Sequence, residues 1–248
     1  MHYQIITTKD NSHTIFLPHL NEHYHSIHGA IQESDHVFIK NGLEYYVNTF
    51  IKTNSKHPSP LVDPSRLQRE GQGEVLKKLN ISILEIGFGT GLNALLTLLK
   101  ASEFSQVQIN YSTIEAHPLP MEIIEQLNYT SILGLSSFNL LHLTEWNKPI
   151  EITNNFTIHK IHNTLQQINL TEKYHIIFFD AFAPEKQPEM WTKEIFEKLF
   201  LHLHPQSILV TYCAKGIIKR TLKEIGFSIE ALQGPPGKRE MIRAIKKS

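Results

Sequence analysis

The residues best suited to chemistry lie where an acidic residue precedes three alternating glycines. Their order is Glu85-Ile86-Gly87-Phe88-Gly89-Thr90-Gly91. An apolar run, residues 81–86, leads into this segment, and a helical run, residues 92–100, follows at once. Glycines let the backbone turn tightly and approach a ligand, because a Cβ would collide there. A carboxylate beside such a turn can receive an ammonium group, directly or through water. The pattern therefore predicts a strand, a ligand-binding turn and a helix.

The glycine spacing separates two classes of nucleotide-type loop. In the dinucleotide fingerprint G-x-G-x-x-G, the third glycine would fall at position 92, which is Leu92. The E-x-G-x-G-x-G form instead resembles motif I of class I S-adenosylmethionine-dependent methyltransferases. That cofactor carries an ammonium and a carboxylate, and it has no pyrophosphate to place on a helix N-terminus. The alternative is an ordinary strand, turn and helix whose glycines occur by chance.

Length and composition limit the class of protein. The 248 residues can form one α/β domain with an appendage, or two small domains. Hydrophobic residues make up 41% of the chain, and no apolar run approaches the roughly 20 residues of a membrane span. The first residues lack the charged and apolar regions of a signal peptide. The single cysteine, Cys213, excludes a disulfide framework and a cysteine metal cluster. We therefore expect a cytoplasmic protein.

Charge is unevenly distributed along the chain, although the formal net charge is zero. Residues 211–248 contain nine Lys/Arg and three Glu, a net charge of +6, so residues 1–210 carry −6. A basic C-terminal part fits a face that binds a polyanion. The alternative is a solvated basic face that has no partner.

From residue 81 onward, apolar strands alternate with helical segments, which is the rhythm of an α/β sheet. The run 174–180 is almost entirely apolar, as expected of a strand buried on both faces. The predicted strands are 81–86, 108–114, 156–161, 174–180, 207–212, 227–232 and 241–245, and the predicted helices are 92–100, 119–127, 188–203 and 216–225. This layout resembles the doubly wound, Rossmann-like sheet of class I methyltransferases, whose last strand is antiparallel.

The first part of the chain is predicted to be a small β-rich extension. Short β-like runs occupy residues 3–7, 14–17, 36–39 and 45–50, and Asn41-Gly42 is a strong hairpin signal between the last two. Residues 52–73 are polar, contain three prolines and predict a connector, with a helix over 64–79. We therefore expect a β-rich N-terminal extension at residues 1–63 and a class I methyltransferase domain at residues 64–248.

Polar residues follow the second and third predicted strands, at the edge where α/β sheets bind ligands. Glu115 ends the second strand, 24 residues after Gly91, where a carboxylate can accept both ribose hydroxyls. Asn163 follows the third strand, where its amide oxygen can accept the adenine amino group. The alternatives are a solvent-facing loop for Glu115, and a turn or helix cap for Asn163.

The fourth strand ends at Asp180-Ala181-Phe182-Ala183-Pro184. This segment loosely resembles the (D/N)-P-P-(Y/F) box of amine-directed methyltransferases, with alanines at 181 and 183. A carboxylate and a backbone carbonyl at the strand end can accept the N–H groups of an amine and orient its lone pair. An aromatic ring can form a wall of the site and favour a transient cation, and Asp180 can also take the leaving proton. The alternative is that Asp180 only caps the next element.

Longer motifs point to one family. The segment from Asp180 to Thr192, D-A-F-A-P-E-K-Q-P-E-M-W-T, is similar to D-G-F-A-P-x-K-N-P-x-M-W of the methyltransferase half of the MnmC family. Residues 86–93, I-G-F-G-T-G-L-N, match that family's glycine loop. Residues 37–39 with Asn41-Gly42-Leu43-Glu44 resemble its V-Y-F and N-G-L-x-E-T segments, and residues 237–241, G-K-R-E-M, match its G-x-K-R-E-M. Two positions depart from the pattern, since Asn163 replaces an acid and Ala181 replaces a glycine.

The resemblance implies transfer of a methyl group from S-adenosylmethionine to the exocyclic amine of 5-aminomethyl-2-thiouridine at the tRNA wobble position 34. Asp180 is then the expected catalytic residue. The cofactor is expected to be bound by Glu85, Gly87, Phe88, Gly89, Thr90, Gly91, Asn93, Glu115, Asn163 and Asp180. The anticodon region of the tRNA is expected to meet Phe182, Pro184, Lys186, Lys215, Lys238 and Arg239.

Bifunctional members of this family carry a second, flavin-dependent domain that removes a carboxymethyl group. No second glycine fingerprint occurs before Ser248. We therefore expect methyl transfer alone, with the aminomethyl substrate supplied by a separate enzyme.

Other functions and sites remain open. The chain could be a class I methyltransferase for a protein or small-molecule amine, or a non-catalytic tRNA-binding module of the same fold. Four histidines lie close together in the sequence: His19, His23, His25 and His28. They lack regular ligand spacing, so we expect loop histidines and no metal. Cys213 is expected to be a small wall residue, because methylation of an exocyclic amine needs no cysteine nucleophile.

Overall fold

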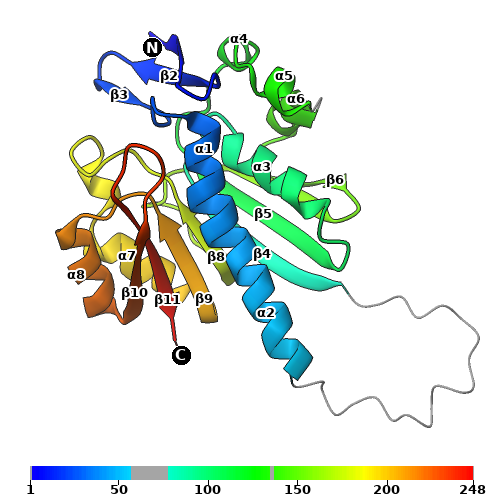
Figure 1. Cartoon of the computed structure of the whole chain (residues 1–248), viewed down its shortest axis with the longest axis vertical. Coiled ribbons are helices and arrows are strands. Elements are labelled where there is room, and N and C mark those ends of the chain that lie inside the picture. The colour runs from blue at the N-terminus through cyan, green and yellow to red at the C-terminus, as the bar shows by residue number, and fades with distance from the viewer. Residues whose placement is uncertain (1, 57–77, 135–136, 248) are drawn as a thin grey trace, which may run out of the picture.

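The fold is built around one mixed sheet with helices on both faces (Figure 1). The computed structural model describes residues 2–56, 78–134 and 137–247. The large sheet contains, in spatial order, β10 (Phe227–Gln233), β11 (Glu240–Lys246), β9 (Leu203–Thr211), β8 (Tyr174–Phe179), β4 (Leu79–Ile86), β5 (Val107–Glu115), β7 (Phe156–His162) and β6 (Pro149–Thr153). A separate antiparallel sheet contains β1 (Gln4–Thr7), β2 (His13–Leu17) and β3 (Glu22–His23).

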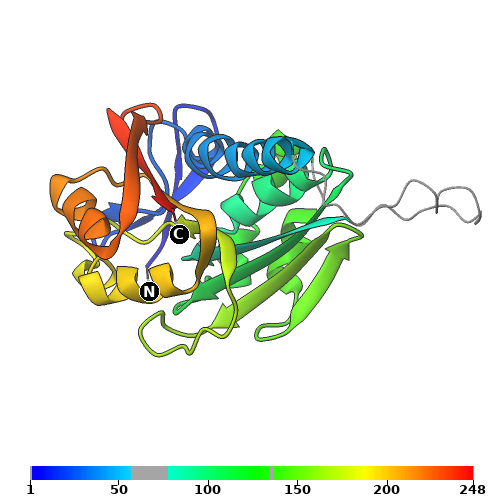
Figure 2. The same cartoon turned by 90° about the horizontal axis from the view of Figure 1, so that it is seen from below.

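Helices connect the strands and cover both faces of the large sheet. They are α1 (Ala30–Ser34), the π-helix η1 (Asp35–Glu44), α2 (Tyr45–Lys56), α3 (Leu92–Ala101), α4 (Met121–Ile124), α5 (Tyr129–Leu133), α6 (Ser137–Leu143), the 3₁₀ turn η3 (Pro188–Met190), α7 (Lys193–Leu201) and α8 (Gly216–Ile225). Figure 2 shows the long blue helix and the gold and orange helices on opposite sides of the sheet. Among the described residues, no helix is long and apolar enough to cross a bilayer.

The strands of the large sheet are buried on two sides. In β8, Ile176 and Phe178 belong to one hydrophobic cluster, and Ile177 and Phe179 belong to the other. Successive side chains of a strand point to opposite faces, so one strand contributes to both cores. This explains why the sequence of β8 is almost continuously apolar.

The strand order creates a crevice at the end of β4. The chain runs from β4 to β5 and β7 on one side, and then returns to β8 and β9 on the other. These five strands are parallel, and β11 pairs antiparallel with β9. The predicted doubly wound sheet with an antiparallel last strand is confirmed, and β6 adds an edge strand that the sequence did not indicate. The order reverses at the carboxyl end of β4, where such sheets bind ligands.

Residues 30–56 form one long helical segment, so the predicted hairpin at residues 36–50 is wrong (Figure 1). Gly42 of the expected Asn41-Gly42 turn lies inside η1. A Cβ at Gly42 would lie 2.9 Å from the ring of Phe178 and 3.2 Å from the side chain of Val210. The glycine therefore lets the helix pack closely against β8 and β9 rather than making a turn.

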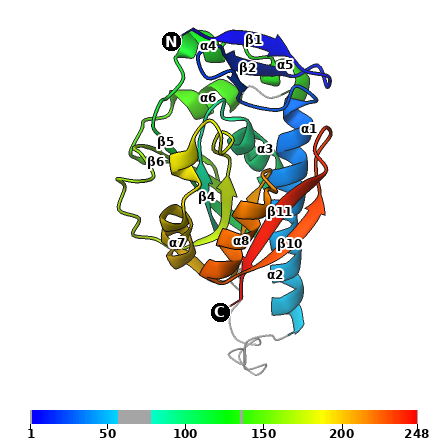
Figure 3. The same cartoon turned by 90° about the vertical axis from the view of Figure 1, so that its left-hand side faces the viewer.

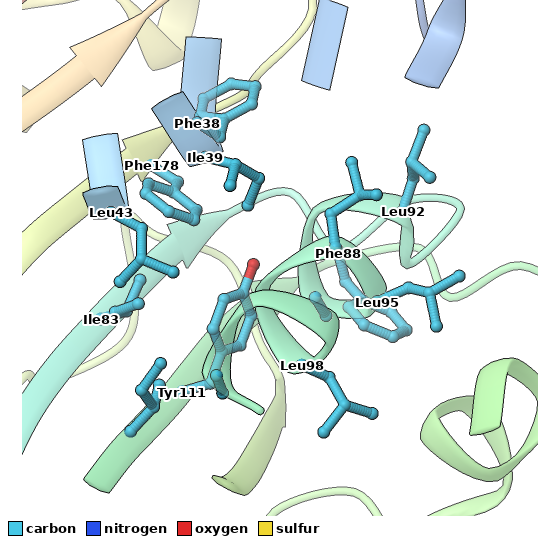
Figure 4. Packing of buried hydrophobic residues seen from close by; sticks show 14 of the residues in the cluster. Phe38, Ile39, Leu43, Ile83, Phe88, Leu92, Leu95, Leu98, Tyr111 and Phe178 are labelled. Atoms are coloured by element: carbon cyan, nitrogen blue, oxygen red, sulfur yellow. The ribbon is translucent and has the colours of Figure 1, made fainter. Parts of the chain in front are cut away.

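The long helix shares its core with the sheet. The rings of Phe38 and Phe178 have centroids 5.3 Å apart, and Leu43 lies in the same buried cluster with Tyr111 and Leu95 (Figure 4). Residues 30–50 thus pack with the large sheet, and the β structure of the N-terminal extension is limited to residues 4–23. The predicted boundary after residue 63 and most of the helix predicted over 64–79 lie outside the described residues.

The small sheet is attached beside α4 and α5 (Figure 3). The backbone N–H of His13 donates to the Asn128 side chain at 2.8 Å, and the Tyr129 hydroxyl donates to the His13 carbonyl at 2.7 Å. The expected small N-terminal β structure is confirmed, and these contacts fix it next to the connections that follow β5.

Candidate active site

A cavity of about 560 Å³ lies where the carboxyl ends of β4, β5, β7 and β8 meet. This volume falls within the usual range of small-molecule sites, about 300–1,000 Å³. The sheet side is lined by Ile86–Thr90, Ile114–His117, Asn163–Gln166 and Asp180–Phe182, with Lys186, Gln187, Glu189 and Met190. The N-terminal extension contributes Leu17, His19, Leu20, Tyr24 and His25.

Two glycines of the loop after β4 are required by close neighbours. Gly87 has φ +91°, and a Cβ there would lie 3.0 Å from the backbone oxygen of Asp180. Gly89 has φ +49°, and a Cβ there would lie 2.9 Å from the ring of Tyr24. L-residues with side chains rarely adopt these φ values. The loop therefore needs glycine to fit between β8 and the N-terminal extension.

Two histidines, the buried His25 and the half-buried His142, hold the glycine loop from outside. His25 Nε2 lies 2.7 Å from the Thr90 hydroxyl, and His142 Nε2 lies 3.0 Å from the Thr90 carbonyl. Burial lowers the pKa of each histidine to about 4, so both are neutral near pH 7. Among the described residues, no group of three or more His, Cys, Asp or Glu side chains is placed to hold a metal. His25 therefore stabilises the glycine loop through its contact with Thr90.

Glu115 presents a fixed carboxylate to the cavity. Its Oε2 accepts the N–H of Gly89 at 3.0 Å, and its Oε1 accepts the N–H of His117 at 2.8 Å. Each carboxylate oxygen retains acceptor capacity after these bonds, so the group can still bind two hydroxyls. The same residue therefore ties the glycine loop to the end of β5 and faces the ligand space.

Asn163 also lines the cavity. Its Oδ1 accepts the N–H of Thr164 at 2.8 Å, and its backbone N–H donates to the Glu115 carbonyl at 3.2 Å. The hydrogen bond with Thr164 is the turn contact that was the alternative role of Asn163. It fixes the Asn163 amide at the cavity wall.

Asp180 is half-buried at the end of β8 and lines the same cavity. Its Oδ2 accepts a hydrogen bond from Asn93 Nδ2 at 2.8 Å. Burial, helped by the charge of Glu33 and opposed by Asn93 and Lys238, raises the pKa of Asp180 to about 7. Asp180 can therefore exchange a proton near neutral pH.

Three side chains hold the peptide groups that follow Asp180. The Tyr212 hydroxyl donates to the Ala181 carbonyl at 2.9 Å, and Trp191 Nε1 donates to the Phe182 carbonyl at 2.7 Å. Gln187 accepts the N–H of Phe182 at 3.2 Å. Trp191 belongs to the M-W part of the motif, and its hydrogen bond to Phe182 orders the end of β8. No sequence motif indicated the role of Tyr212.

Three of the residues expected to bind the cofactor lie behind the cavity wall. Glu85, Gly91 and Asn93 do not line the cavity, whereas the other seven do. Glu85 is fully buried beside Thr113, Asn93 and Tyr111, and burial raises its pKa to about 8. In this position Asn93 contacts Asp180, and Glu85 lies beneath the loop.

The residues expected to meet the tRNA divide between two cavities. Phe182 and Lys186 line the first. Pro184, Lys215, Lys238 and Arg239 line a second cavity of about 550 Å³, together with Ala183, Glu185, Tyr212, Cys213, Ala214 and Glu240. The segment from 180 to 184 thus lines the first cavity with its first three residues and the second with its last two.

Several basic residues near these cavities are paired internally. Lys215 forms an ion pair with Glu185, and Lys238 forms one with Glu33 at 2.7 Å. Within the described part of the chain, the Lys186 and Arg239 side chains have neither ion pair nor hydrogen bond. The charge free to attract a polyanion is therefore smaller than the sequence count indicates.

One further prediction concerns Glu115. Glu115→Ala should weaken S-adenosylmethionine binding by about 1–3 kcal/mol, because partner hydroxyls and the Gly89 N–H lose their acceptor. Isothermal titration calorimetry measures the change. Glu122→Ala, at an exposed position of α4, is the control and should bind as the wild type does. Equal affinity of the two variants would move Glu115 out of the cofactor site.

Comparison with known proteins agrees with this geometry. A family model described as S-adenosyl-L-methionine-dependent methyltransferase matches residues 136–247. The bifunctional tRNA 5-methylaminomethyl-2-thiouridine biosynthesis protein MnmC of Burkholderia mallei (strain SAVP1) is 26% identical over 246 residues, covering 92% of this chain and 33% of that protein. MnmC of Burkholderia pseudomallei (strain K96243) is 27% identical over 249 residues, covering 92% and 34%. The chain thus spans about a third of the length of these relatives.

Solved structures give the same fold. MNMC2 from Aquifex aeolicus superimposes with a TM-score of 0.70 at 21% identity, covering 100% of this chain and 71% of that one. Spermidine synthase from Thermotoga maritima gives 0.54 at 13% identity, covering 99% and 69%. Sequence relatives, family model and fold together agree with the resemblance predicted from the motifs: the chain has the fold of an S-adenosylmethionine-dependent methyltransferase and is similar to the MnmC proteins.

Proposed function

We propose that this chain transfers a methyl group from S-adenosylmethionine to the exocyclic amine of 5-aminomethyl-2-thiouridine at position 34 of tRNA. One observation carries the chemical part of the proposal. Asp180 presents a half-buried carboxylate to the cavity, on a segment whose peptide groups are held by neighbouring side chains. The choice of tRNA as substrate is supported by the names of the MnmC relatives.

The cavity fits the cofactor. When bound, S-adenosylmethionine supplies an electrophilic methyl carbon on a sulfonium. We assign Glu115, which lines the cavity, to the ribose hydroxyls, and Asn163, which also lines it, to the adenine amino group. The backbone of Gly87 and Gly89 lines the cavity without side chains that would obstruct a ligand. Glu85 is fully buried, so we assign it to support of the loop rather than to direct contact.

Asp180 has two tasks at the acceptor amine. An aminomethyl group is largely protonated near neutral pH, and an ammonium has no lone pair. The Asp180 carboxylate can hold this cation, and a proton then leaves to water or to the carboxylate itself, whose pKa of about 7 permits the transfer. The neutral amine keeps its N–H bonds directed at Asp180 and a nearby carbonyl, so its lone pair points at the methyl carbon. Phe182 forms an aromatic wall of the same cavity.

A tRNA substrate would approach the mouth of the two cavities. Arg239, on the loop between β10 and β11, is exposed, and Lys186 lies at the first cavity. We assign these side chains, with Lys215 and Pro184, to the contact with the anticodon region.

The contact of Arg239 with phosphate is testable by its salt dependence. Arg239→Ala should raise the KM for tRNA and reduce the slope of log KM against log salt by about 0.7. Lys148→Ala removes an exposed cation outside the basic C-terminal part and should leave the slope unchanged. If the Arg239 variant retains the wild-type slope, the basic C-terminal face only aids solubility.

The function itself is tested with a defined substrate. An anticodon stem-loop carrying 5-aminomethyl-2-thiouridine at position 34 should gain one methyl group on incubation with protein and S-adenosylmethionine, as seen by mass spectrometry of its nucleosides. Methylation of proteins or small amines, with none of the RNA, would replace the proposal by the other methyltransferase function. Failure to bind S-adenosylmethionine in calorimetry would favour a non-catalytic module.

A further inference from the structure

Lys238 is held in place by two partners. Its ammonium lies 2.7 Å from Glu33 Oε1 and 3.6 Å from the centre of the Tyr212 ring. The side chain of Lys238 is 33% exposed, whereas that of Glu33 is only 8% exposed. Lys238 lies on the loop between β10 and β11, and Glu33 lies in α1. The contact therefore joins two segments that lie 205 positions apart in the chain.

The Glu33 carboxylate is held by a second contact besides Lys238. Its second oxygen, Oε2, accepts the N–H of Ser26 at 2.7 Å. The carboxylate is thus fixed from both sides in a nearly buried place, where an unpaired charge would be strongly disfavoured. Moving Lys238 outward to a phosphate would leave Glu33 without a cation.

The loop that carries Lys238 is packed against the N-terminal region. A Cβ at Gly237 would collide with the ring of His28, and Gly237 has φ +86°. The glycine next to Lys238 therefore allows the loop to lie against the segment before α1. This packing keeps the lysine directed inward.

Tyr212 connects Lys238 to the reaction centre. Its ring lies under the ammonium, and its hydroxyl donates to the Ala181 carbonyl at 2.9 Å. Ala181 directly follows Asp180. Burial raises the pKa of Tyr212 well above its usual value, so the hydroxyl keeps its proton and remains a donor.

We propose that Lys238, held by Glu33, is a positioning residue that fixes Tyr212 and, through its hydroxyl, the Ala181 carbonyl beside Asp180. Of the adjacent residues Lys238 and Arg239, only Arg239 then contacts a tRNA phosphate. The inference rests on the proposed function, in which the strand end after β8 orients the methyl acceptor.

Kinetics with the anticodon stem-loop separate positioning from phosphate binding. Tyr212→Phe removes the hydroxyl and keeps the ring, and Lys238→Met keeps an unbranched side chain one heavy atom shorter and removes the charge. Each should lower kcat by about 10- to 100-fold, since small misplacement near reacting atoms has effects of this size. The salt slope of KM should stay at the wild-type value. Lys219→Met, which removes a neighbouring surface lysine paired with Glu240, should leave kcat unchanged.

Two results would overturn the proposal. One is wild-type kcat in the Tyr212→Phe variant. The other is a flattened salt slope with wild-type kcat in the Lys238→Met variant, which would make Lys238 a phosphate contact. Because Lys238→Met leaves Glu33 uncompensated, the double variant Glu33→Gln/Lys238→Met is measured beside it, and it should show the same loss of kcat with a normal unfolding transition.

Nuclear magnetic resonance tests the contact without tRNA. In protein with ¹⁵N-labelled lysine, one ammonium signal should be protected from exchange and shifted upfield by the Tyr212 ring. It should vanish in Lys238→Met, lose protection in Glu33→Gln and lose the upfield shift in Tyr212→Leu. Absence of this signal from the wild type would overturn the proposal whatever the activity. An inactive wild type that shows the signal would instead contradict the proposed function and leave the inferred contact intact.

Discussion

Asp180→Ala is expected to lose at least about 100-fold in kcat for methyl transfer, with a modest change in S-adenosylmethionine affinity. The reason is loss of the carboxylate that holds the amine and takes part in removing its proton. The measurement is kcat at saturating stem-loop, with cofactor affinity from calorimetry. Asp180→Asn keeps a carbonyl oxygen as acceptor and should lose less. Asp35→Ala, which removes a partly exposed carboxylate paired with Lys40, is the control and should behave as the wild type does.

The pH profile gives a second readout of the same residue. The pKa of Asp180 is raised to about 7 by burial, so the carboxyl is protonated below that pH and ionised above it. Only the ionised form can hold an ammonium or take its proton. The wild-type kcat/KM should therefore rise with pH through about 7, and ionisation of the substrate amine adds to the rise in the same direction. Asp180→Asn should lose the inflection near 7 and keep that of the amine. Near-wild-type kcat in Asp180→Ala would make Asp180 a structural cap.

Gly89→Val is expected to weaken S-adenosylmethionine binding by at least about 100-fold, because two unfavourable effects act together. A β-branched residue is strained at φ +49°, and its Cβ would lie 2.9 Å from the ring of Tyr24. Either the loop or Tyr24 must then move, and both line the cofactor cavity. Calorimetry measures the affinity, and thermal unfolding checks that the chain remains folded.

Gly134 provides a matched control for this substitution. It also has a positive φ, +68°, but a Cβ there would meet nothing within 4 Å, and it lies outside the cavity lining. Gly134→Val therefore carries similar backbone strain without the collision, and its cofactor affinity should equal that of the wild type. If Gly89→Val retains wild-type affinity as well, the loop after β4 does not form the cofactor site.

Much of the sheet could be predicted because its signals are local. The apolar run of β4 followed by alternating glycines, and the nearly continuous apolar sequence of β8, depend only on neighbouring residues. The positive φ values of Gly87 and Gly89 follow from the same short pattern. Strand ends meet at one edge in any doubly wound sheet, so Glu115 and Asp180 could be placed together before the structure was known.

The hairpin prediction failed because the local signals at residues 36–50 conflicted. The Asn41-Gly42 pair and the β-branched residues favour strands. Ile39, Leu43 and Val47 recur at every fourth residue, which is the helical spacing, and all three are buried. Packing against the large sheet favours the helix over the strands, because the sheet has an apolar face that a helix can cover. Gly42 lets the helix approach that face closely.

The sequence by itself thus determined the glycine loop, the positions of the parallel strands along the chain and the acids at their ends. The tertiary structure alone decided which charges and polar groups are free. Lys238 looks like a surface cation in the sequence, but a carboxylate 205 positions away binds it. Glu85 looks like a ligand group, but packing buries it beneath the loop. Tyr24 and His25 reach the cavity only because the N-terminal extension folds over it. The physical reason is that φ preferences and hydrophobic periods depend on near neighbours, whereas burial and ion pairing depend on residues that folding brings together from distant parts of the chain.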